Sequence, residues 1–249
     1  IMSEFGTMDD FDQLLSSIHQ RGMKLILDLV VNHTSDEHPW FIESKSSKTN
    51  AKRDWYIWAD PKPDGSEPNN WESIFNGSTW EYDDTTKQYY FHLFSKKQPD
   101  LNWSNPDVRE AVFKMMNWWF EKGIDGFRVD AITHIKKTFE AGDLPVPKGK
   151  QYAPAFDVDM NQPGIQDWLQ EMKDKSLSHY DIMTVGEANG VNPDNAKEWV
   201  GEKEGKFNMI FQFEHLGLWS TGDSKFDVLS YKNVLNRWQK QLEGIGWNA

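Results

Sequence analysis

The chain of 249 residues contains no cysteine, so it can form no disulfide and can use no thiol in catalysis. This lack fits a reducing compartment, and we expect a cytoplasmic location. No apolar run reaches the roughly 20 residues that a membrane-spanning helix needs. Acidic residues also outnumber basic ones, with 39 Asp and Glu and 27 Lys and Arg. A surface that binds nucleic acid needs the opposite balance, so we expect neither a nucleic acid nor a membrane partner.

Apolar periodicity predicts helices and short buried strands in alternation. The run 24–31 is nearly all apolar, which is typical of a strand buried on both faces of a parallel sheet. Further strands are predicted at 127–131, 181–187 and 207–213, and helices at 7–20, 106–122, 164–175, 195–201 and 227–242. This order predicts a parallel α/β fold, either an open doubly wound sheet or an eight-stranded barrel. No glycine-rich phosphate loop follows a strand, which disfavours a nucleotide-binding sheet.

Residues 34–103 interrupt this alternation. They are rich in proline, Ser, Asn and Asp, and they hold many of the aromatic residues that make up 14% of the chain. Residues 80–91 are typical of a hairpin with its turn at 83–87. The stretch is too long for a simple loop. We therefore expect three parts, which are a barrel segment at 1–33, an inserted domain at 34–103 and a second barrel segment at 104–249.

Polar residues recur where the predicted strands end, at Asn32-His33, Arg128 with Asp130, Glu187, and Glu214-His215. Barrel enzymes carry their active sites on that face. Arg128 and Asp130 are two residues apart in a strand, so their side chains should face the same space. A nearby guanidinium keeps a carboxylate ionised, and an ionised carboxylate can act as a nucleophile. The alternative is an ordinary buried Arg–Asp pair.

Glu187 has no cation beside it in the sequence. A less polar setting raises the pKa of a carboxyl group and suits it to act as a general acid. Two carboxylates with pKa values pushed apart are what glycoside hydrolysis needs. Glu187 could also be an ion-paired strand end. His33 could donate a hydrogen bond to a sugar hydroxyl, or it could be a core histidine that closes its strand.

Four segments resemble the signatures of the α-amylase family, glycoside hydrolase family 13. In chain order they are DLVVNH at 28–33, QPDLNW at 98–103, GFRVD at 126–130 and VGE at 185–187. The second resembles the signature of the oligo-1,6-glucosidase and α-glucosidase subfamily. The resemblance runs along the whole chain. It implies a partial (β/α)8 TIM barrel, from about strand 3 to strand 6 with flanking helices, and a domain B inserted after strand 3.

Carried over residue by residue, the resemblance implies that Asp130 is the nucleophile and Glu187 the acid/base. Arg128 would position Asp130, and His33 would bind the sugar in the −1 subsite. Three residues of the inserted domain would border that pocket, namely Phe75, Phe94 and Gln98. The two phenylalanines could instead be core residues of the inserted domain.

The function implied is that of a retaining exo-α-glucosidase acting on short oligosaccharides through a covalent glucosyl-enzyme. In this subfamily the residue after the nucleophile tends to be Val in α-1,6-acting enzymes and Ala or Thr in α-1,4-acting ones. Ala131 therefore implies an α-1,4 preference. An oligo-1,6-glucosidase, a trehalose-6-phosphate hydrolase and a sucrose- or trehalose-isomerising enzyme remain alternatives. A non-catalytic transporter heavy chain or a carbohydrate-binding module would not explain the ordered carboxylates.

The family's third carboxylate, an Asp after a His on strand seven, has no counterpart in this sequence. The start at Ile1 and the strand-like residues at the other end predict a central fragment of a longer chain. We expect such a fragment to be poorly stable and inactive alone. We expect no cofactor and no metal ligands among its residues. Calcium in the parent and the oligomeric state stay open.

Overall fold

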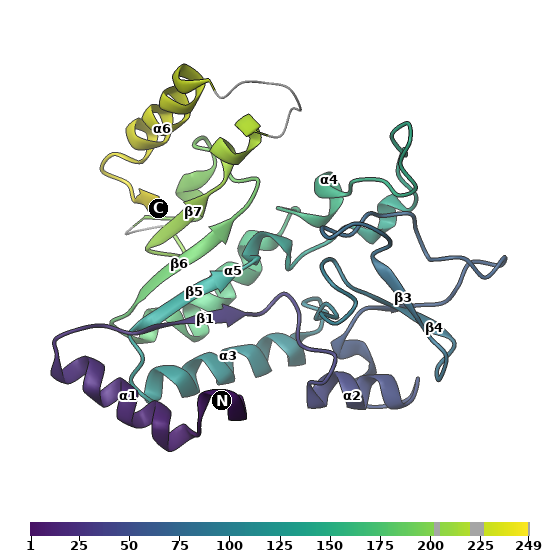
Figure 1. The fold of residues 1–249 in the computed structure, drawn as a ribbon, viewed down its shortest axis with the longest axis horizontal. Helices are drawn as coiled ribbons and strands as arrows, with labels where there is room; N and C mark the ends of the chain where they lie inside the picture. Colours follow the sequence, from purple (N-terminus) through teal and green to yellow (C-terminus); the bar gives the residue numbers. More distant parts are fainter. Residues whose placement is uncertain (202–204, 220–226, 249) are drawn as a thin grey trace.

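The computed structural model describes residues 1–201, 205–219 and 227–248, and its main feature is a parallel sheet (Figure 1). The strand order is β1-β5-β6-β7-β8. The strands are β1 (Ile26–Val30), β5 (Gly126–Asp130), β6 (Met183–Ala188), β7 (Met209–Gln212) and β8 (Trp247–Asn248). The four predicted strands are confirmed, with bounds that differ from the predicted ones by one or two residues at each end. The expected start of another strand near the end of the chain is β8.

Four of the five predicted helices are also present. They are α1 (Met8–Gln20), α3 (Pro106–Glu121), α5 (Ile165–Lys175) and α6 (Val228–Leu242). Thr7 and Asp10 form a capping box at the start of α1, and the Asn105 side chain accepts from the Asp107 N–H at the start of α3. The helix expected at 195–201 is only a 3-10 turn, Ala196–Glu198.

The remaining helical segments are short. They are α2 (Pro39–Ser46), α4 (Phe156–Asp159) and the 3-10 turns Ser3–Phe5, Arg53–Trp55, Ile132–His134, Phe139–Ala141, Leu177–His179 and Glu214–Trp219. Several of these turns directly follow or precede strands of the sheet. They shape the loops at the strand ends, and two of their residues, Ile132 and Leu177, also belong to the buried core.

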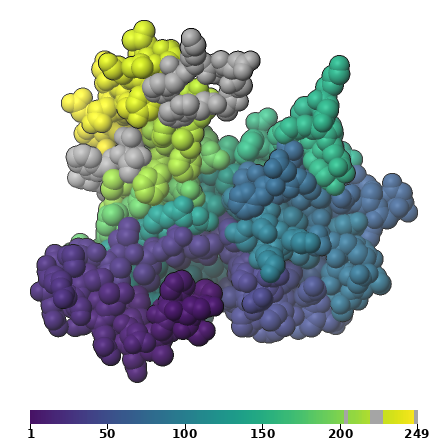
Figure 2. Space-filling view, in the orientation of Figure 1, coloured from purple at the N-terminus to yellow at the C-terminus, as the bar shows by residue number. Residues whose placement is uncertain are grey.

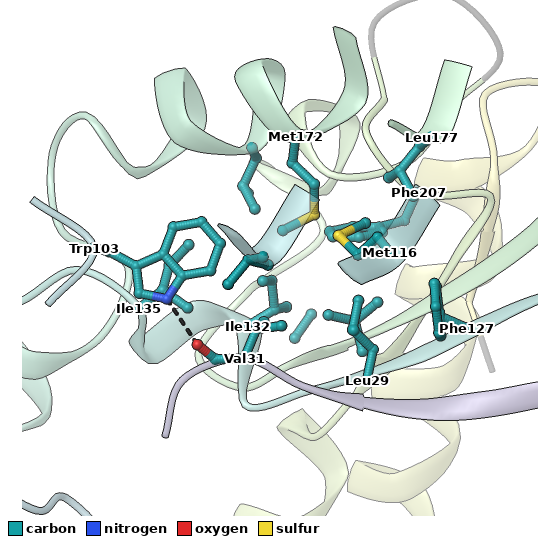
Figure 3. Packing of buried hydrophobic residues seen from close by; sticks show 14 of the residues in the cluster. Leu29, Val31, Trp103, Met116, Phe127, Ile132, Ile135, Met172, Leu177 and Phe207 are labelled. Atoms are coloured by element: carbon teal, nitrogen blue, oxygen red, sulfur yellow. Dashed lines mark hydrogen bonds between the residues drawn. The ribbon is translucent and has the colours of Figure 1, made fainter. Parts of the chain in front are cut away.

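One face of the sheet packs against the helices. Leu29, Phe127 and Val129 from β1 and β5 are at most 2% exposed, and they meet Met116 of α3 and other residues of the same buried cluster. Figure 3 shows this packing, together with the hydrogen bond of 2.8 Å from Trp103 Nε1 to the Val31 carbonyl. The core therefore fixes where β1 and β5 end.

The other face of the sheet is more open. Asp28 and Val30 of β1 lie on it, and Val30 is 41% exposed. The prediction that this strand is buried on both faces was therefore wrong. The physical reason is that β1 is an edge strand and the helices pack on one side of it only. Polar side chains of β5 and β6 share this open face.

The segment between β1 and α3 folds around a second, antiparallel sheet. Its order is β2-β4-β3, with β2 (Trp58–Ala59), β3 (Trp80–Asp83) and β4 (Gln88–Phe91). The predicted hairpin is confirmed as β3 and β4, whereas α2 and β2 were not predicted. A second aromatic core, with Trp71 at its centre, also draws on residues beyond 103, among them Phe139 and Ala155. The domain boundaries at 33 and 103 stay a prediction.

Figure 2 shows this inserted part (blue) as a block beside the N-terminal helix (purple). Within the part of the chain that the structure describes, no helix is both long and apolar enough to cross a bilayer. The cytoplasmic location stays a prediction.

Candidate active site

Strand β5 presents Arg128 and Asp130 on the open face because its residues alternate. Phe127 and Val129 are buried against the helices, while the side chains of Arg128 and Asp130 are 28% and 22% exposed. The strand begins at Gly126, where a Cβ atom would lie 1.7 Å from the carbonyl oxygen of Met183 in β6. Only glycine allows this close approach of the two strands.

Arg128 contacts three carboxylates. Its Nη1 lies 2.6 Å from Asp130 Oδ1 and 2.8 Å from Asp28 Oδ1, and its Nη2 lies 2.9 Å from Glu187 Oε1. The predicted proximity of Arg128 and Asp130 is confirmed. Burial acts to lower the pKa of Arg128, but the hydrogen bonds to Asp28 and Asp130 outweigh it, so the pKa lies above its usual value. The guanidinium is therefore a fixed positive charge.

Glu187 does not lie in the less polar setting that its sequence neighbours suggested, and that expectation was wrong. Besides the contact with Arg128, its Oε2 accepts a hydrogen bond of 2.9 Å from the backbone N–H of Ala131. The neighbours along the chain are small or apolar, but the neighbours across the sheet are not. Both oxygens of Glu187 are therefore held by groups of β5 and of the residue that follows it.

Ala131 donates this hydrogen bond from a left-handed conformation, with φ 44° and ψ 32°. Such a φ is uncommon for a residue other than glycine. The side chain is 5% exposed, so a larger residue would have to displace its surroundings. The turn at Ala131 ends β5 directly after Asp130 and aims a backbone donor at β6.

His33 and the residues that were predicted to border the pocket lie together. His33 Nε2 is 2.9 Å from Gln98 Nε2, and the His33 ring lies 5.2 Å from the ring of Phe94. Burial lowers the pKa of His33, although the charges of Asp100 and Asp130 act in the other direction. A neutral His33 ring can accept a hydrogen bond from the Gln98 amide.

Phe75 lies 5.8 Å from Phe94, measured between ring centroids, and extends the same group of side chains. It is 61% exposed, so it is not a core residue. Phe94 is partly buried and packs against the second aromatic core. The two rings therefore differ, because Phe94 is held by packing whereas Phe75 is accessible to solvent.

A buried cation beside this group was missed by the sequence reasoning. Lys137 Nζ lies 2.6 Å from Asp100 Oδ2, 3.0 Å from Asn32 Oδ1 and 2.6 Å from the carbonyl oxygen of His134. The side chains of Lys137 and Asp100 are 1% and 0% exposed. Asn32 and Asp100 lie inside the first two of the four motifs. The only sequence signal for a cation beside them is the lysine that follows the third motif.

The last pair of polar strand-end residues does not join the Arg128 cluster. Glu214 forms an ion pair with Arg237 and accepts a hydrogen bond of 2.9 Å from Trp238 Nε1, both in α6. His215 Nδ1 is 2.9 Å from Gln212 Nε2. In residues 1–201, 205–219 and 227–248 no group of three or more His, Asp or Glu side chains is suited to hold a metal ion.

The comparisons with known proteins agree on one family. All of residues 1–249 match the family described as the catalytic domain of alpha amylase. The chain is 64% identical over 250 residues to a probable oligo-1,6-glucosidase 3 of Bacillus subtilis strain 168, covering 100% of this chain and 45% of that protein.

Solved structures give the same result. A trehalose-6-phosphate hydrolase of Bacillus licheniformis superposes with a TM-score of 0.90 at 43% identity, over 100% of this chain and 45% of that one. An isomaltulose synthase of Erwinia rhapontici NX5 gives a TM-score of 0.88 at 38% identity, over 100% and 44%. The chain spans less than half the length of these proteins.

The parallel strands are therefore part of a TIM barrel with an inserted antiparallel domain, and not an open doubly wound sheet. The resemblance drawn from the four motifs is confirmed. The chain belongs to the alpha-amylase family and forms part of its catalytic domain.

Proposed function

We propose that the protein carrying this chain is a retaining exo-α-glucosidase that removes terminal α-linked glucose from short oligosaccharides. The observation that carries the proposal is that Asp130 and Glu187, from neighbouring strands, both contact one guanidinium, that of Arg128. Retaining glycosidases use two carboxyl groups about 5–5.5 Å apart, and a shared guanidinium favours such a short separation.

Asp130 is the nucleophile in this proposal. Its carboxylate attacks C1 of the glucosyl unit, a C1–O bond to Asp130 forms, and the glycosidic C1–O bond breaks. Glu187 transfers its proton to the departing oxygen. A water molecule then loses a proton to Glu187 and attacks C1, which releases Asp130 and glucose with retained configuration.

The surrounding side chains support binding of a sugar in front of these carboxylates. Arg128 places a positive charge beside Asp130 and holds its carboxylate in position. His33 and Gln98 offer polar atoms for hydroxyl groups, and Phe94 and Phe75 offer apolar surface. A small oligosaccharide is therefore the proposed partner.

The linkage has two candidates. Ala131, as the residue after the proposed nucleophile, favours α-1,4 by resemblance to the subfamily. The name of the Bacillus subtilis relative, oligo-1,6-glucosidase, favours α-1,6. The similarity to a trehalose-6-phosphate hydrolase adds trehalose 6-phosphate as a third candidate substrate.

Glucose release from maltose, isomaltose and trehalose 6-phosphate tests the proposal directly. We expect the full-length protein to release glucose from maltose faster than from isomaltose, and an Asp130→Asn variant to lose activity on both. We expect residues 1–249 alone to be inactive. A full-length protein that releases no glucose from any of the three substrates would refute the proposed function, and a preference for isomaltose would reverse the linkage.

A further inference from the structure

We propose that Asn161 is a positioning residue that holds the loop after β6, and with it Glu187, against the loop after β5. The proposal rests on the proposed function, because it concerns the placing of the acid/base relative to the nucleophile. Asn161 belongs to neither strand and to none of the four motifs.

Asn161 is hydrogen-bonded to both loops at once. Its backbone N–H donates to the Thr133 carbonyl at 2.8 Å, and its side-chain Nδ2 donates to the Asn189 carbonyl at 2.9 Å. Thr133 lies shortly after Asp130 in the chain, and Asn189 shortly after Glu187. One residue therefore bridges the two segments that follow the two proposed catalytic carboxylates.

The segment that carries Asn161 is itself braced. Gln162 Nε2 donates to the carbonyls of Asp157 and Met160, at 2.9 and 2.8 Å, and Thr138 Oγ1 donates to Gln162 Oε1 at 2.6 Å. Gln162 is only 7% exposed. Hydrogen bonds that are shielded from water hold a segment firmly, so the backbone at Asn161 is fixed in position.

The backbone at Asn161 is left-handed, with φ 52°. Asparagine accepts this conformation better than most residues, and glycine accepts it freely. Across the contact, Gly190 has φ 71°, and a Cβ atom there would lie 2.4 Å from Met160 Cε and 2.8 Å from Asn161 Nδ2. The close approach of the two loops thus depends on a special residue on each side.

The bridge complements the contacts that Glu187 makes itself. Ala131 N–H and Arg128 hold the Glu187 oxygens from the β5 side, while Asn161 holds the chain just after Glu187. Loss of the Asn161–Asn189 bond would let Glu187 shift against Asp130. Proton transfer depends steeply on such geometry, whereas binding by His33 and Gln98 does not involve this loop.

Two variants isolate the side-chain bond. Asn161→Gly keeps the left-handed backbone and its N–H but removes the amide. Asn161→Asp keeps the shape but places an acceptor against the Asn189 carbonyl. The matched control is Lys87→Gly, which replaces another left-handed residue, φ 56°, in the hairpin turn of the inserted domain.

The measurement is kcat/KM of the full-length protein on maltose and on α-glucosyl fluoride. Both substrates form the same glucosyl-enzyme, but only the maltose leaving group needs a proton from Glu187. We expect both Asn161 variants to lose about 10- to 100-fold on maltose and less than about threefold on the fluoride. Lys87→Gly should leave both values unchanged.

Equal losses on both substrates, or no loss on either, would overturn the proposal for Asn161. So would a failure of both variants to fold, because Asn161 would then determine folding rather than the site. A wild-type protein inactive on both substrates would instead refute the proposed function. The two failures are therefore distinguished by the wild-type reaction alone.

Discussion

Lys137 and Asp100 form an ion pair that is almost completely removed from solvent, with 2.6 Å between Nζ and Oδ2. The two residues come from the loop after β5 and from the end of the inserted part, and Asn32 at the end of β1 hydrogen-bonds to both. A buried pair of this kind costs desolvation energy, but removal of one partner leaves the other charge uncompensated. The pair therefore fixes the insertion against the barrel.

Replacement of Lys137 by methionine should destabilise the full-length protein by about 3–5 kcal/mol, because Asp100 would remain buried without its cation. Urea unfolding measures the change. The control is Lys136→Met, since Lys136 lies over the Trp168 ring, 4.3 Å from its centroid, and should cost only about 0.5–1 kcal/mol. A loss below 1 kcal/mol at Lys137 would contradict this account.

Arg128→Lys should lower kcat/KM by about 100-fold, although it conserves the charge. A lysine ammonium is a single point of charge, whereas the Arg128 guanidinium reaches Asp28, Asp130 and Glu187 through two nitrogens. Steady-state kinetics on maltose measures the effect. Arg109→Lys is the matched control, because Arg109 pairs with Glu171 at 2.6 Å outside the site. Similar losses in both variants would argue against a role for Arg128 at the site.

The placing of Asp130 could be predicted because a strand alternates its side chains, so Arg128 and Asp130 had to share a face. The surroundings of Glu187 could not, because its cation lies on another strand and depends on the register of β5 against β6. Lys137 and Asp100 pose the same difficulty across an insertion. Helix α2 spans 8 residues and β2 spans 2. Both elements are too short for an apolar periodicity to reveal them in the sequence.

The folded protein should lose stability in acid as the Asp125 carboxylate becomes protonated. Its pKa is lowered from 3.8 to about 2, since burial acts to raise it but hydrogen bonds from Lys24, the Leu25 N–H and His19 prevail. A lowered pKa stabilises the folded state above about pH 4, and this contribution disappears as the pH falls towards 2. The shift corresponds to about 2 kcal/mol, and the Asp125 side chain is only 14% exposed.

Asp125→Asn should therefore cost about 2 kcal/mol at pH 7, and the difference from wild type should fall to less than about half of this near pH 2.5. Unfolding curves at the two pH values measure it. Asp84→Asn is the control, because the Asp84 side chain is 92% exposed in the hairpin turn and its ion pair with Lys87 lies at the surface, so the change should be small at either pH. A penalty at Asp125 that does not depend on pH would show that packing, not charge, is responsible.

Ala131→Val should move activity from maltose towards isomaltose, if the residue after Asp130 sets the linkage. The substitution should also destabilise the folded protein, because Ala131 is left-handed and buried. This loss of stability has to be measured apart from the change in specificity. Any β-branched residue there should be strained by about 1–3 kcal/mol. Ala131→Thr is the matched control, since threonine is branched like valine but is associated with α-1,4 activity in the subfamily that the motifs resemble.

We expect both variants to lower the unfolding midpoint by similar amounts and only the valine variant to raise the ratio of isomaltose to maltose hydrolysis. The ratio is measured from kcat/KM on the two sugars, which compares transition states directly. Equal shifts in both variants would assign the effect to side-chain volume. An unchanged ratio in the valine variant would show that Ala131 does not set the linkage, and the α-1,4 preference would then lose its support.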